Sequence, residues 1–180
     1  MEKTFPRNVF LCGFMATGKS SVGRQLAQLL KYEFVDMDAL IEAEAGMTIP
    51  DIFATKGEAV FRSMESDLID RLAPGTGRVV ATGGGAVVNP RNLDAIKQSG
   101  ALITLTADPR IILSRVGSAE DRPMLAGENK EERIRNLLKA REHAYAQADI
   151  TVDTSSLSID QVARAIFDSL QHRFRKHEPL

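Results

Sequence analysis

One segment near the start of the chain has the residue types and spacing of a phosphate-binding loop. Residues 13–20 read Gly-Phe-Met-Ala-Thr-Gly-Lys-Ser, which is Gly, four residues, then Gly-Lys-Ser. Glycines allow the backbone to turn its N–H groups towards phosphate oxygens, and the helix that follows adds the partial positive charge of its N-terminus. In such loops the lysine, here Lys19, reaches the β- and γ-phosphates, and the hydroxyl, here Ser20, binds Mg²⁺. This pattern predicts a nucleoside triphosphate site and is the strongest signal in the chain.

Two aspartates lie at the end of the apolar run Phe34–Met37 and just after it. If that run continues as a strand, Asp36 and Asp38 project to the same side, roughly 6.5–7 Å apart. One carboxylate could then hold a water molecule on Mg²⁺, and the other could accept a hydrogen bond from the hydroxyl that attacks the phosphate. A structural interpretation of Asp38 stays open, because it could also be the N-cap of a helix over Ala39–Ala45.

Three consecutive glycines follow another apolar run. Gly83, Gly84 and Gly85 come after Val79–Ala81 and Thr82. Each glycine is less favourable than alanine in regular structure by about 0.5–1 kcal/mol, so three together favour a place where the backbone closely approaches a ligand. The alternative interpretation is a loose turn.

Two arginines indicate a second anion site. Arg141 shares one helical face with apolar residues from Ile134 to Tyr145. A guanidinium on such a face needs an anion, which could be a carboxylate of the protein or of a substrate. Arg62 and Glu65 lie three residues apart, which fits either a surface ion pair or the edge of a pocket.

Residues 117–129 are rich in Gly, Ser and charge, and we expect them to be mobile. An arginine on a flexible loop is usually just solvated. Above a phosphate loop, however, Arg122 could close on the transferring phosphoryl group, exclude water and neutralise developing charge. We also expect residues 172–180 to be a flexible tail.

Five short apolar runs alternate with segments of helical spacing. The runs are Val9–Cys12, Phe34–Met37, Val79–Ala81, Ala101–Leu105 and Ile150–Val152. Runs this short, each followed by a turn or helix-start residue, predict buried strands. Their alternation with helices predicts a three-layer α/β/α sandwich with a parallel sheet, in which ligands bind at the carboxyl ends of the strands. Ser158 is the predicted N-cap of the last helix.

The composition is that of an ordinary globular protein, and we expect a single domain over residues 1–180. The chain is 43% hydrophobic and 26% charged with a formal net charge of −1, so it lacks the basic excess typical of nucleic-acid-binding proteins. Its single cysteine, Cys12, cannot form an intramolecular disulfide, and three histidines offer few ligands for structural zinc. Without an apolar run near the ~18 residues of a membrane span, or an apolar stretch at the N-terminus, we expect a cytoplasmic protein with no membrane partner.

A phosphate loop alone fits a GTPase, an ATPase motor or a small-molecule kinase. A GTPase would need an Asn-Lys-x-Asp motif, but residues 129–132, Asn-Lys-Glu-Glu, lack the aspartate. A motor usually has a strand that ends in an aspartate for the metal-bound water, whereas here the third run is followed by Thr82 and three glycines. The sequence supports neither of these two classes well.

Taken together, these residues resemble the shikimate kinase family, from Asn8 to about Leu170. The motifs that carry the resemblance are Gly13–Ser20, Val35–Asp38, Phe61–Glu65, Gly83–Gly85, Arg122–Leu125, and Arg141 with Tyr145. The resemblance implies a P-loop, nucleoside-monophosphate-kinase-like fold with a five-stranded parallel sheet and a lid at about residues 117–129. It also implies ATP-dependent phosphorylation of the 3-hydroxyl of shikimate to shikimate 3-phosphate, a step in chorismate and aromatic amino acid biosynthesis. One Mg²⁺ ion with ATP as co-substrate and a monomeric enzyme are part of the same expectation.

The resemblance implies a role for each matching residue. Catalysis would involve Asp38, Lys19 and Arg122. Substrate binding would involve Asp38, Arg62, Gly84 and Arg141, together with Gly83, Gly85, Phe53, Phe61 and Glu65. ATP would contact Gly13, Met15, Ala16, Thr17, Gly18, Lys19, Ser20, Ser21, Arg115 and Arg122. Mg²⁺ would be held by Ser20 and, through water, by Asp36.

Two residues depart from the usual pattern of the family. Ala16 stands where the phosphate loop usually has another glycine, and Met124 replaces a usual leucine of the lid. Alanine tolerates such a turn if its φ angle is negative, so we expect altered nucleotide affinity at most.

Two other functions stay open at this point. One is a gluconate-kinase-like sugar-acid kinase, which turnover on gluconate would reveal. The other is a non-catalytic, nucleotide-binding regulatory module, which would bind ATP tightly without phosphorylating a small molecule.

Overall fold

Five strands form the centre of the molecule. In the computed structural model, which describes residues 6–116 and 129–175, they are β1 (Asn8–Gly13), β2 (Glu33–Asp36), β3 (Arg78–Ala81), β4 (Ala101–Thr106) and β5 (Ile150–Asp153). All neighbouring strands pair in parallel, in the order β2-β3-β1-β4-β5. The predicted strands are confirmed except at one end, because β2 stops at Asp36 and Met37 already belongs to the next helix.

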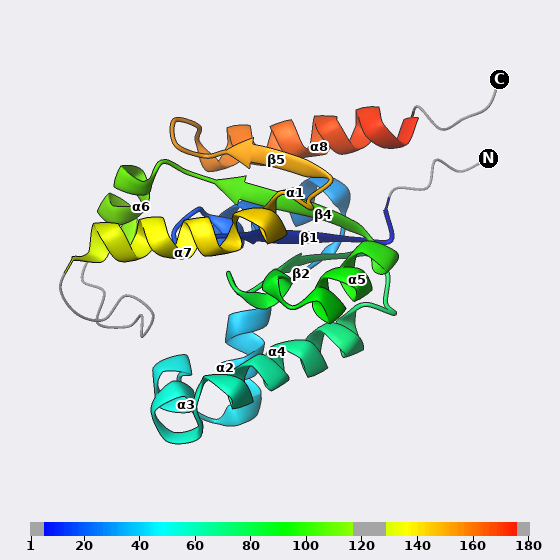
Figure 1. Cartoon of the computed structure of the whole chain (residues 1–180). Coiled ribbons are helices and arrows are strands. Elements are labelled where there is room, and N and C mark those ends of the chain that lie inside the picture. Colours follow the sequence, from blue (N-terminus) through cyan, green and yellow to red (C-terminus); the bar gives the residue numbers. More distant parts are fainter. Residues whose placement is uncertain (1–5, 117–128, 176–180) are drawn as a thin grey trace.

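Helices connect the strands and cover both faces of the sheet (Figure 1). They are α1 (Lys19–Leu30), α2 (Met37–Ala45), α3 (Ile49–Lys56), α4 (Glu58–Leu72), α5 (Pro90–Ser99), α6 (Pro109–Val116), α7 (Lys130–Tyr145) and α8 (Ile159–Arg175), with a 3₁₀ turn, η1 (Ala86–Val88). Apolar residues of α1 and α8 share one core cluster, and those of α2 to α5 share another. The predicted three-layer α/β/α sandwich is confirmed.

The core lies on both sides of β1, which is buried along its whole length. Val9 and Leu11 belong to the cluster under α1 and α8, whereas Phe10 and Cys12 belong to the cluster on the other face. This division follows from the strand, in which successive side chains point to opposite faces. Because β1 is buried between two neighbouring strands, its carboxyl end is held in place. The phosphate loop begins at this end.

The last helix begins as the sequence predicts. Ser158 Oγ accepts a hydrogen bond from Gln161 N at 3.2 Å, and Ser158 N donates to Gln161 Oε1 at 2.9 Å, which is a reciprocal capping box. α8 then continues to Arg175, so residues 172–175 are helical, although we expected a flexible tail from residue 172. Residues 176–180 lie outside the described part of the chain.

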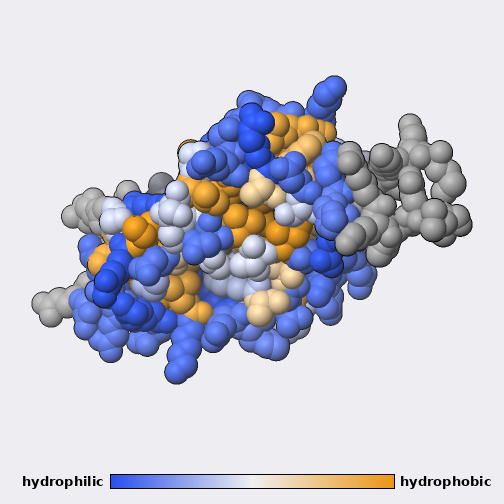
Figure 2. Space-filling view, turned by 90° about the horizontal axis from the view of Figure 1, so that it is seen from above, coloured by the Kyte–Doolittle hydropathy of each residue, from blue (hydrophilic) through white to orange (hydrophobic). Residues whose placement is uncertain are grey.

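Hydrophilic residues dominate the outline of the molecule seen from above and surround areas of apolar ones (Figure 2). The large apolar side chains that are exposed in the described residues are Val60, Val88, Leu157 and Ile159. They lie on α4, next to α4 on η1, and around the start of α8. Within the described ranges, no helix has the length and apolar character needed to span a bilayer.

Candidate active site

The phosphate loop joins β1 to α1, as predicted. Gly13 has a φ of 135° and Gly18 a φ of 95°, angles that favour glycine. A Cβ on Gly13 would lie 2.2 Å from the carbonyl oxygen of Leu105, so no side chain fits there. Lys19 Nζ donates hydrogen bonds to the carbonyl oxygens of Gly13 and Phe14, both at 3.0 Å. The loop therefore curls around an ammonium group at the carboxyl end of the central strand.

Ala16 adopts a backbone conformation that we did not expect. Its φ is 61°, in the left-handed region, so the condition under which alanine tolerates the turn, a negative φ, is not met. For a residue with a Cβ this conformation costs roughly 1–2 kcal/mol. The carbonyl oxygen of Ala16 accepts a hydrogen bond from Arg115 Nη1 at 3.3 Å, and Arg115 Nη2 donates to the carbonyl oxygen of Thr154 at 2.8 Å. Arg115 thus connects the strained turn of the loop to the residue that follows β5.

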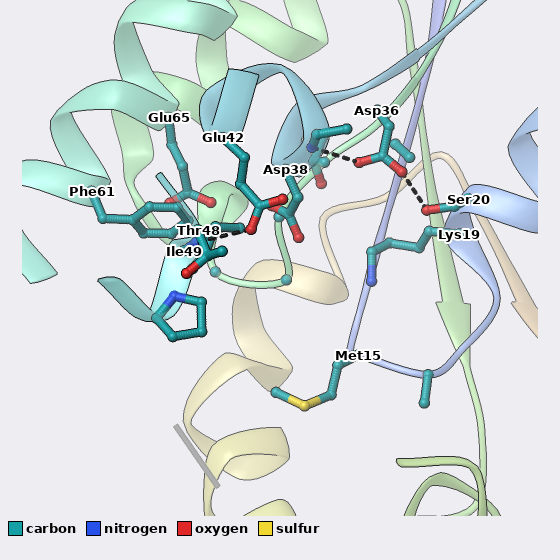
Figure 3. A pocket seen from close by; sticks show the side chains of 18 of the residues that line it. Met15, Lys19, Ser20, Asp36, Asp38, Glu42, Thr48, Ile49, Phe61 and Glu65 are labelled. Carbon is teal, nitrogen blue, oxygen red and sulfur yellow. Dashed lines mark hydrogen bonds between the residues drawn. The ribbon is translucent and has the colours of Figure 1, made fainter. Parts of the chain in front are cut away.

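Asp36 lies beside the phosphate loop, where β2 meets α2. Ser20 Oγ donates a hydrogen bond to Asp36 Oδ2 at 2.5 Å, and Asp36 Oδ1 accepts from Ala39 N at 3.4 Å (Figure 3). Asp36 is therefore the N-cap of α2, the role that the sequence left open for Asp38. Because β2 ends at Asp36, the expectation that both aspartates project from one side of a continuous strand is wrong.

Asp38 lies in the first turn of α2 and lines a cavity in front of the phosphate loop. Its Oδ1 is 3.3 Å from the position that a Cβ would take on Gly83. In Figure 3, Asp38 stands between Lys19 on one side and Phe61 on the other. A carboxylate in this position can accept a hydrogen bond from a hydroxyl group placed next to the phosphates.

The glycines of residues 83–85 follow β3 and lie against charged side chains. A Cβ would be 2.1 Å from Glu65 Oε1 on the first glycine, 3.1 Å from Arg141 Nη1 on the second and 2.7 Å from Arg62 Nη1 on the third. Side chains at the first and third positions would therefore displace the carboxylate and the guanidinium. The loose-turn interpretation fails, because the glycines are what allows these charged groups to approach the backbone.

Arg141 is a buried cation on α7, with only 7% of its surface exposed. Its Cζ lies 5.5 Å from the centre of the Phe14 ring. Among the residues that the structure describes, no carboxylate forms an ion pair with it. The charge of Arg141 acts on the nearby carboxylate of Glu65, but Glu65 forms its salt bridge with Arg62. Since a buried guanidinium without a direct salt bridge is costly, this geometry favours an anion from outside the chain as its partner.

Tyr145, one turn after Arg141, connects α7 to the glycine segment. Its hydroxyl donates a hydrogen bond to the carbonyl oxygen of Gly84 at 2.6 Å. Burial raises the pKa of Tyr145 to about 12, so the hydroxyl keeps its proton and remains a donor at neutral pH. The same residue accepts a bond at its backbone carbonyl from Thr104 Oγ1 on β4, at 2.9 Å. The end of α7 is therefore held by both the sheet and the glycine segment.

Arg62 and Glu65 form an ion pair at the cavity, with 2.6 Å between Nη1 and Oε2. The Glu65 side chain is 1% exposed and that of Arg62 is 30% exposed, so the interpretation as a surface pair is wrong. Burial raises the pKa of Glu65 above its usual value, although the charge of Arg62 opposes this shift. Glu65 Oε1 is buried and has no hydrogen-bond partner among the described residues. The buried carboxylate holds the guanidinium at the edge of the cavity.

Two aromatic rings form an apolar wall on the side of the cavity away from the phosphate loop. The ring centres of Phe53, on α3, and Phe61, on α4, are 5.0 Å apart. The guanidinium carbon of Arg62 lies 5.3 Å from the centre of the Phe61 ring. This wall offers an apolar surface next to a cation, which suits a molecule with an apolar face and an acidic group.

One cavity of about 820 Å³ brings most of the predicted site residues together. Those that line it are Met15, Ala16, Gly18, Lys19, Ser20, Ser21, Asp36, Asp38, Phe53, Phe61, Arg62, Glu65, Gly83, Gly84, Gly85 and Arg141. Gly13, Thr17 and Arg115 are not among the lining residues; they belong to or contact the loop. Arg122 and Met124 lie outside the described residues.

The cavity also has lining residues that sequence analysis did not select. They are Ala39, Glu42, Thr48, Ile49, Pro50, Ala81, Thr82 and Val116. Glu42 had a signal, because it lies four residues after Asp38 and therefore on the same face of a helix. The approach of α3 to this face is a tertiary contact, which helical spacing alone does not show.

Comparison with known proteins identifies the family. A family model described as shikimate kinase matches residues 15–171. The chain belongs to the shikimate kinase family. Similar members include shikimate kinases of Geobacter sulfurreducens, 48% identical over 89% of this chain and 88% of that protein, and of Pelotomaculum thermopropionicum, 47% identical over 92% and 96%. The protein is thus a kinase with a P-loop nucleotide-binding fold, as the sequence predicts.

Solved structures of this family have the same fold. The shikimate kinase from Acinetobacter baumannii, solved in complex with shikimate, superposes with a TM-score of 0.91 at 37% identity, covering 95% of this chain and 96% of that one. A gluconokinase from Sinorhizobium meliloti gives a TM-score of 0.64 at 17% identity, covering 96% and 95%, which shows a shared fold alone.

Proposed function

We propose that this protein transfers the γ-phosphoryl group of ATP to the 3-hydroxyl of shikimate, giving shikimate 3-phosphate and ADP. The observation that carries the proposal is Arg141, a buried cation without a carboxylate partner in the described residues, which lines the same cavity as Lys19 and Asp38. A ring with one carboxylate and several hydroxyls complements a guanidinium at one end and a carboxylate acceptor at the other. The complex of the Acinetobacter baumannii relative with shikimate supports the same substrate.

The side chains of the cavity divide the reaction between them. Arg62 and Arg141 would bind the substrate carboxylate, and the wall of Phe53 and Phe61 would contact the apolar part of the ring. Asp38 would accept a hydrogen bond from the attacking hydroxyl and orient its oxygen towards the phosphate. Phosphoryl transfer depends mainly on such positioning and on neutralising charge, so these contacts account for most of the chemistry the protein must supply.

The residues beside the phosphate loop fit one Mg²⁺ ion bound together with ATP. Ser20 Oγ and Asp36 Oδ2 are 2.5 Å apart, and both are oxygen atoms of the kind that Mg²⁺ prefers. Ser20 would bind the ion directly and Asp36 through water. The ion, when bound, neutralises charge on the phosphates. The role of Arg122 as the arginine of the lid is a prediction for residues outside the described part of the chain.

We also propose a monomeric enzyme that acts in the cytoplasm. The net charge of −1 supports the absence of a nucleic-acid partner. Light scattering after size exclusion measures the oligomeric state, and a mass near 19.7 kDa is the expected result.

A coupled assay of ADP formation tests the proposal. Purified protein receives Mg-ATP with shikimate, with gluconate or with neither. We expect ADP to form at a substantial rate with shikimate only, and one molecule of shikimate 3-phosphate to form for each ADP. Faster turnover on gluconate would favour a sugar-acid kinase. Tight ATP binding without any phosphorylated product would favour a regulatory module.

A further inference from the structure

Glu42 is a carboxylate in the cavity to which the proposed reaction gives no role. It lies on α2, one helical turn after Asp38, and the two residues therefore share a face of the helix. Figure 3 shows Glu42 beside Asp38 on the side towards Thr48 and Ile49, which line the same cavity.

Glu42 connects α2 to the beginning of α3. Its Oε1 accepts a hydrogen bond from the backbone N–H of Ile49 at 2.8 Å. Ile49 is the first residue of α3, and the first N–H groups of a helix have no partner within the helix. Thr48 Oγ1 caps a different amide, that of Asp51, at 3.3 Å. Glu42 therefore satisfies an amide that the N-cap leaves open, and its negative charge suits the helix N-terminus.

The hydrogen bond between Glu42 and Ile49 fixes α3, the helix that carries Phe53 of the apolar wall. Ile49 and Phe53 are one turn apart on α3, and both line the cavity. Only residues 46–48 connect the two helices, and Gly46 in this turn has a φ of 65°. The side chain of Glu42 thus links the helix of Asp38 directly to the helix of the apolar wall, across a short and permissive turn.

We propose that Glu42 is a positioning residue for the acceptor, which sets the distance between Asp38 and the cavity-lining face of α3 formed by Ile49 and Phe53. The inference rests on the proposed function, because it assumes that the acceptor binds between these groups. Glu42 acts through the amide of Ile49 and not by contact with the reacting atoms. It therefore affects how well the acceptor fits, while the triphosphate site at the other end of the cavity does not depend on it.

Three variants test this role. Glu42→Ala removes the accepting oxygen, and Glu42→Gln keeps an oxygen in the same place without the charge. Glu44→Ala is the matched control, because it removes an exposed carboxylate of the same helix that pairs with Arg71 and does not line the cavity.

The three variants should differ in their KM for shikimate. Loss of a hydrogen bond to a charged group predicts a rise of about tenfold in Glu42→Ala, with the KM for ATP changed by less than about twofold. Glu42→Gln should stay within about threefold of the wild type. Glu44→Ala should have the KM values of the wild type, since an exposed ion pair contributes little.

Amide hydrogen exchange gives a readout that does not require turnover. Exchange at residues 49–52 should become faster in Glu42→Ala and should be largely restored in Glu42→Gln, while α8 keeps wild-type protection. Unchanged exchange in Glu42→Ala would overturn the inference whatever the substrate. Equal KM effects of Ala and Gln, or a parallel rise in the KM for ATP, would also overturn it. A wild-type protein that does not phosphorylate shikimate would instead refute the proposed function. The amide hydrogen exchange measurement would still test whether Glu42 holds the amide of Ile49.

Discussion

Asp36 and Asp38 have different roles because the chain changes from strand to helix between them. Asp36 ends β2, caps α2 and accepts the hydrogen bond of Ser20, so it holds the junction between strand and helix beside the phosphate loop. Asp38 lies in the first turn of α2 and lines the cavity. At the scale of residues, we therefore propose that Asp38 alone accepts a hydrogen bond from the attacking hydroxyl.

Replacement of Asp38 by asparagine should abolish transfer but preserve ATP binding. An asparagine keeps the shape but loses the charge that accepts the proton of the hydroxyl, and positioned acid–base groups contribute about 10²–10⁴-fold. We expect kcat to fall by at least about 100-fold, with the calorimetric Kd for ATP unchanged. Asp94→Asn, at an exposed position of α5, is the matched control. Near-normal turnover of Asp38→Asn would leave the residue with no catalytic role.

Replacement of Arg141 by lysine should weaken acceptor binding specifically. Lysine keeps the charge but cannot offer the two parallel donors with which a guanidinium binds a carboxylate. We expect the KM for shikimate to rise by about tenfold or more, with the KM for ATP unaffected. Arg135→Lys, on the same helix but exposed, should behave as the wild type. If Arg141→Lys raised both KM values equally, Arg141 would not be the acceptor's anchor.

At the scale of elements, the sequence was sufficient to predict those features that depend on residues near one another in the chain. The strands, the phosphate loop and the cap at Ser158 each depend on residues close together in the sequence, and all were predicted. The end of β2 was not, because Asp36 is held by Ser20, which is 16 residues away. The sequence also could not show the burial of Glu65 or the contact of Glu42 with Ile49. The first depends on the packing of α4 against Gly83, and the second joins α2 to α3.

The φ of Ala16 shows the same limit within the phosphate loop. The sequence shows that an alanine replaces a usual glycine, but only the closed path of the loop shows that the position is left-handed. The loop therefore keeps its shape at the expense of local strain. Glycine would adopt the same angle without strain.

The variant Ala16→Gly should therefore stabilise the protein. Glycine removes the strain of a left-handed alanine, but it also gives the unfolded chain more conformational freedom, which opposes the gain. The difference predicts an increase of about 0.5–1 kcal/mol in the free energy of unfolding. Ala140→Gly, at an exposed position in the middle of α7, should have the opposite sign and cost about 1 kcal/mol. Urea unfolding of both variants measures these values. A loss of stability in Ala16→Gly would show that the angle is not a source of strain.

At the scale of the whole molecule, a buried thiol on the central strand should make the protein less stable at alkaline pH. Cys12 on β1 is 0% exposed and contacts Thr104 Oγ1 at 3.0 Å. Burial raises the pKa of Cys12 from 9.0 to about 11, although the bond with Thr104 opposes this shift. Below the unfolded value the thiol is protonated in both states. Above it the unfolded chain releases the proton first, so stability is lost as the pH rises towards the folded value.

The free energy of unfolding should fall by about 1.4 kcal/mol per pH unit from this group, between about pH 9 and 11. Cys12→Ala should remove that part of the slope, while the similar effect of Tyr145 remains at higher pH. Denaturant titrations across this range measure the difference between the two proteins. Parallel curves for the wild type and Cys12→Ala would contradict the assignment of a buried, protonated thiol.

The position of a bound acceptor tests the central claim most directly. A crystal structure of the protein with shikimate and ADP should place the carboxylate between the guanidinium groups of Arg62 and Arg141. The 3-hydroxyl should lie about 3 Å from a carboxylate oxygen of Asp38 and face the phosphate loop. A shikimate molecule bound elsewhere, or one with its carboxylate away from Arg141, would contradict the account.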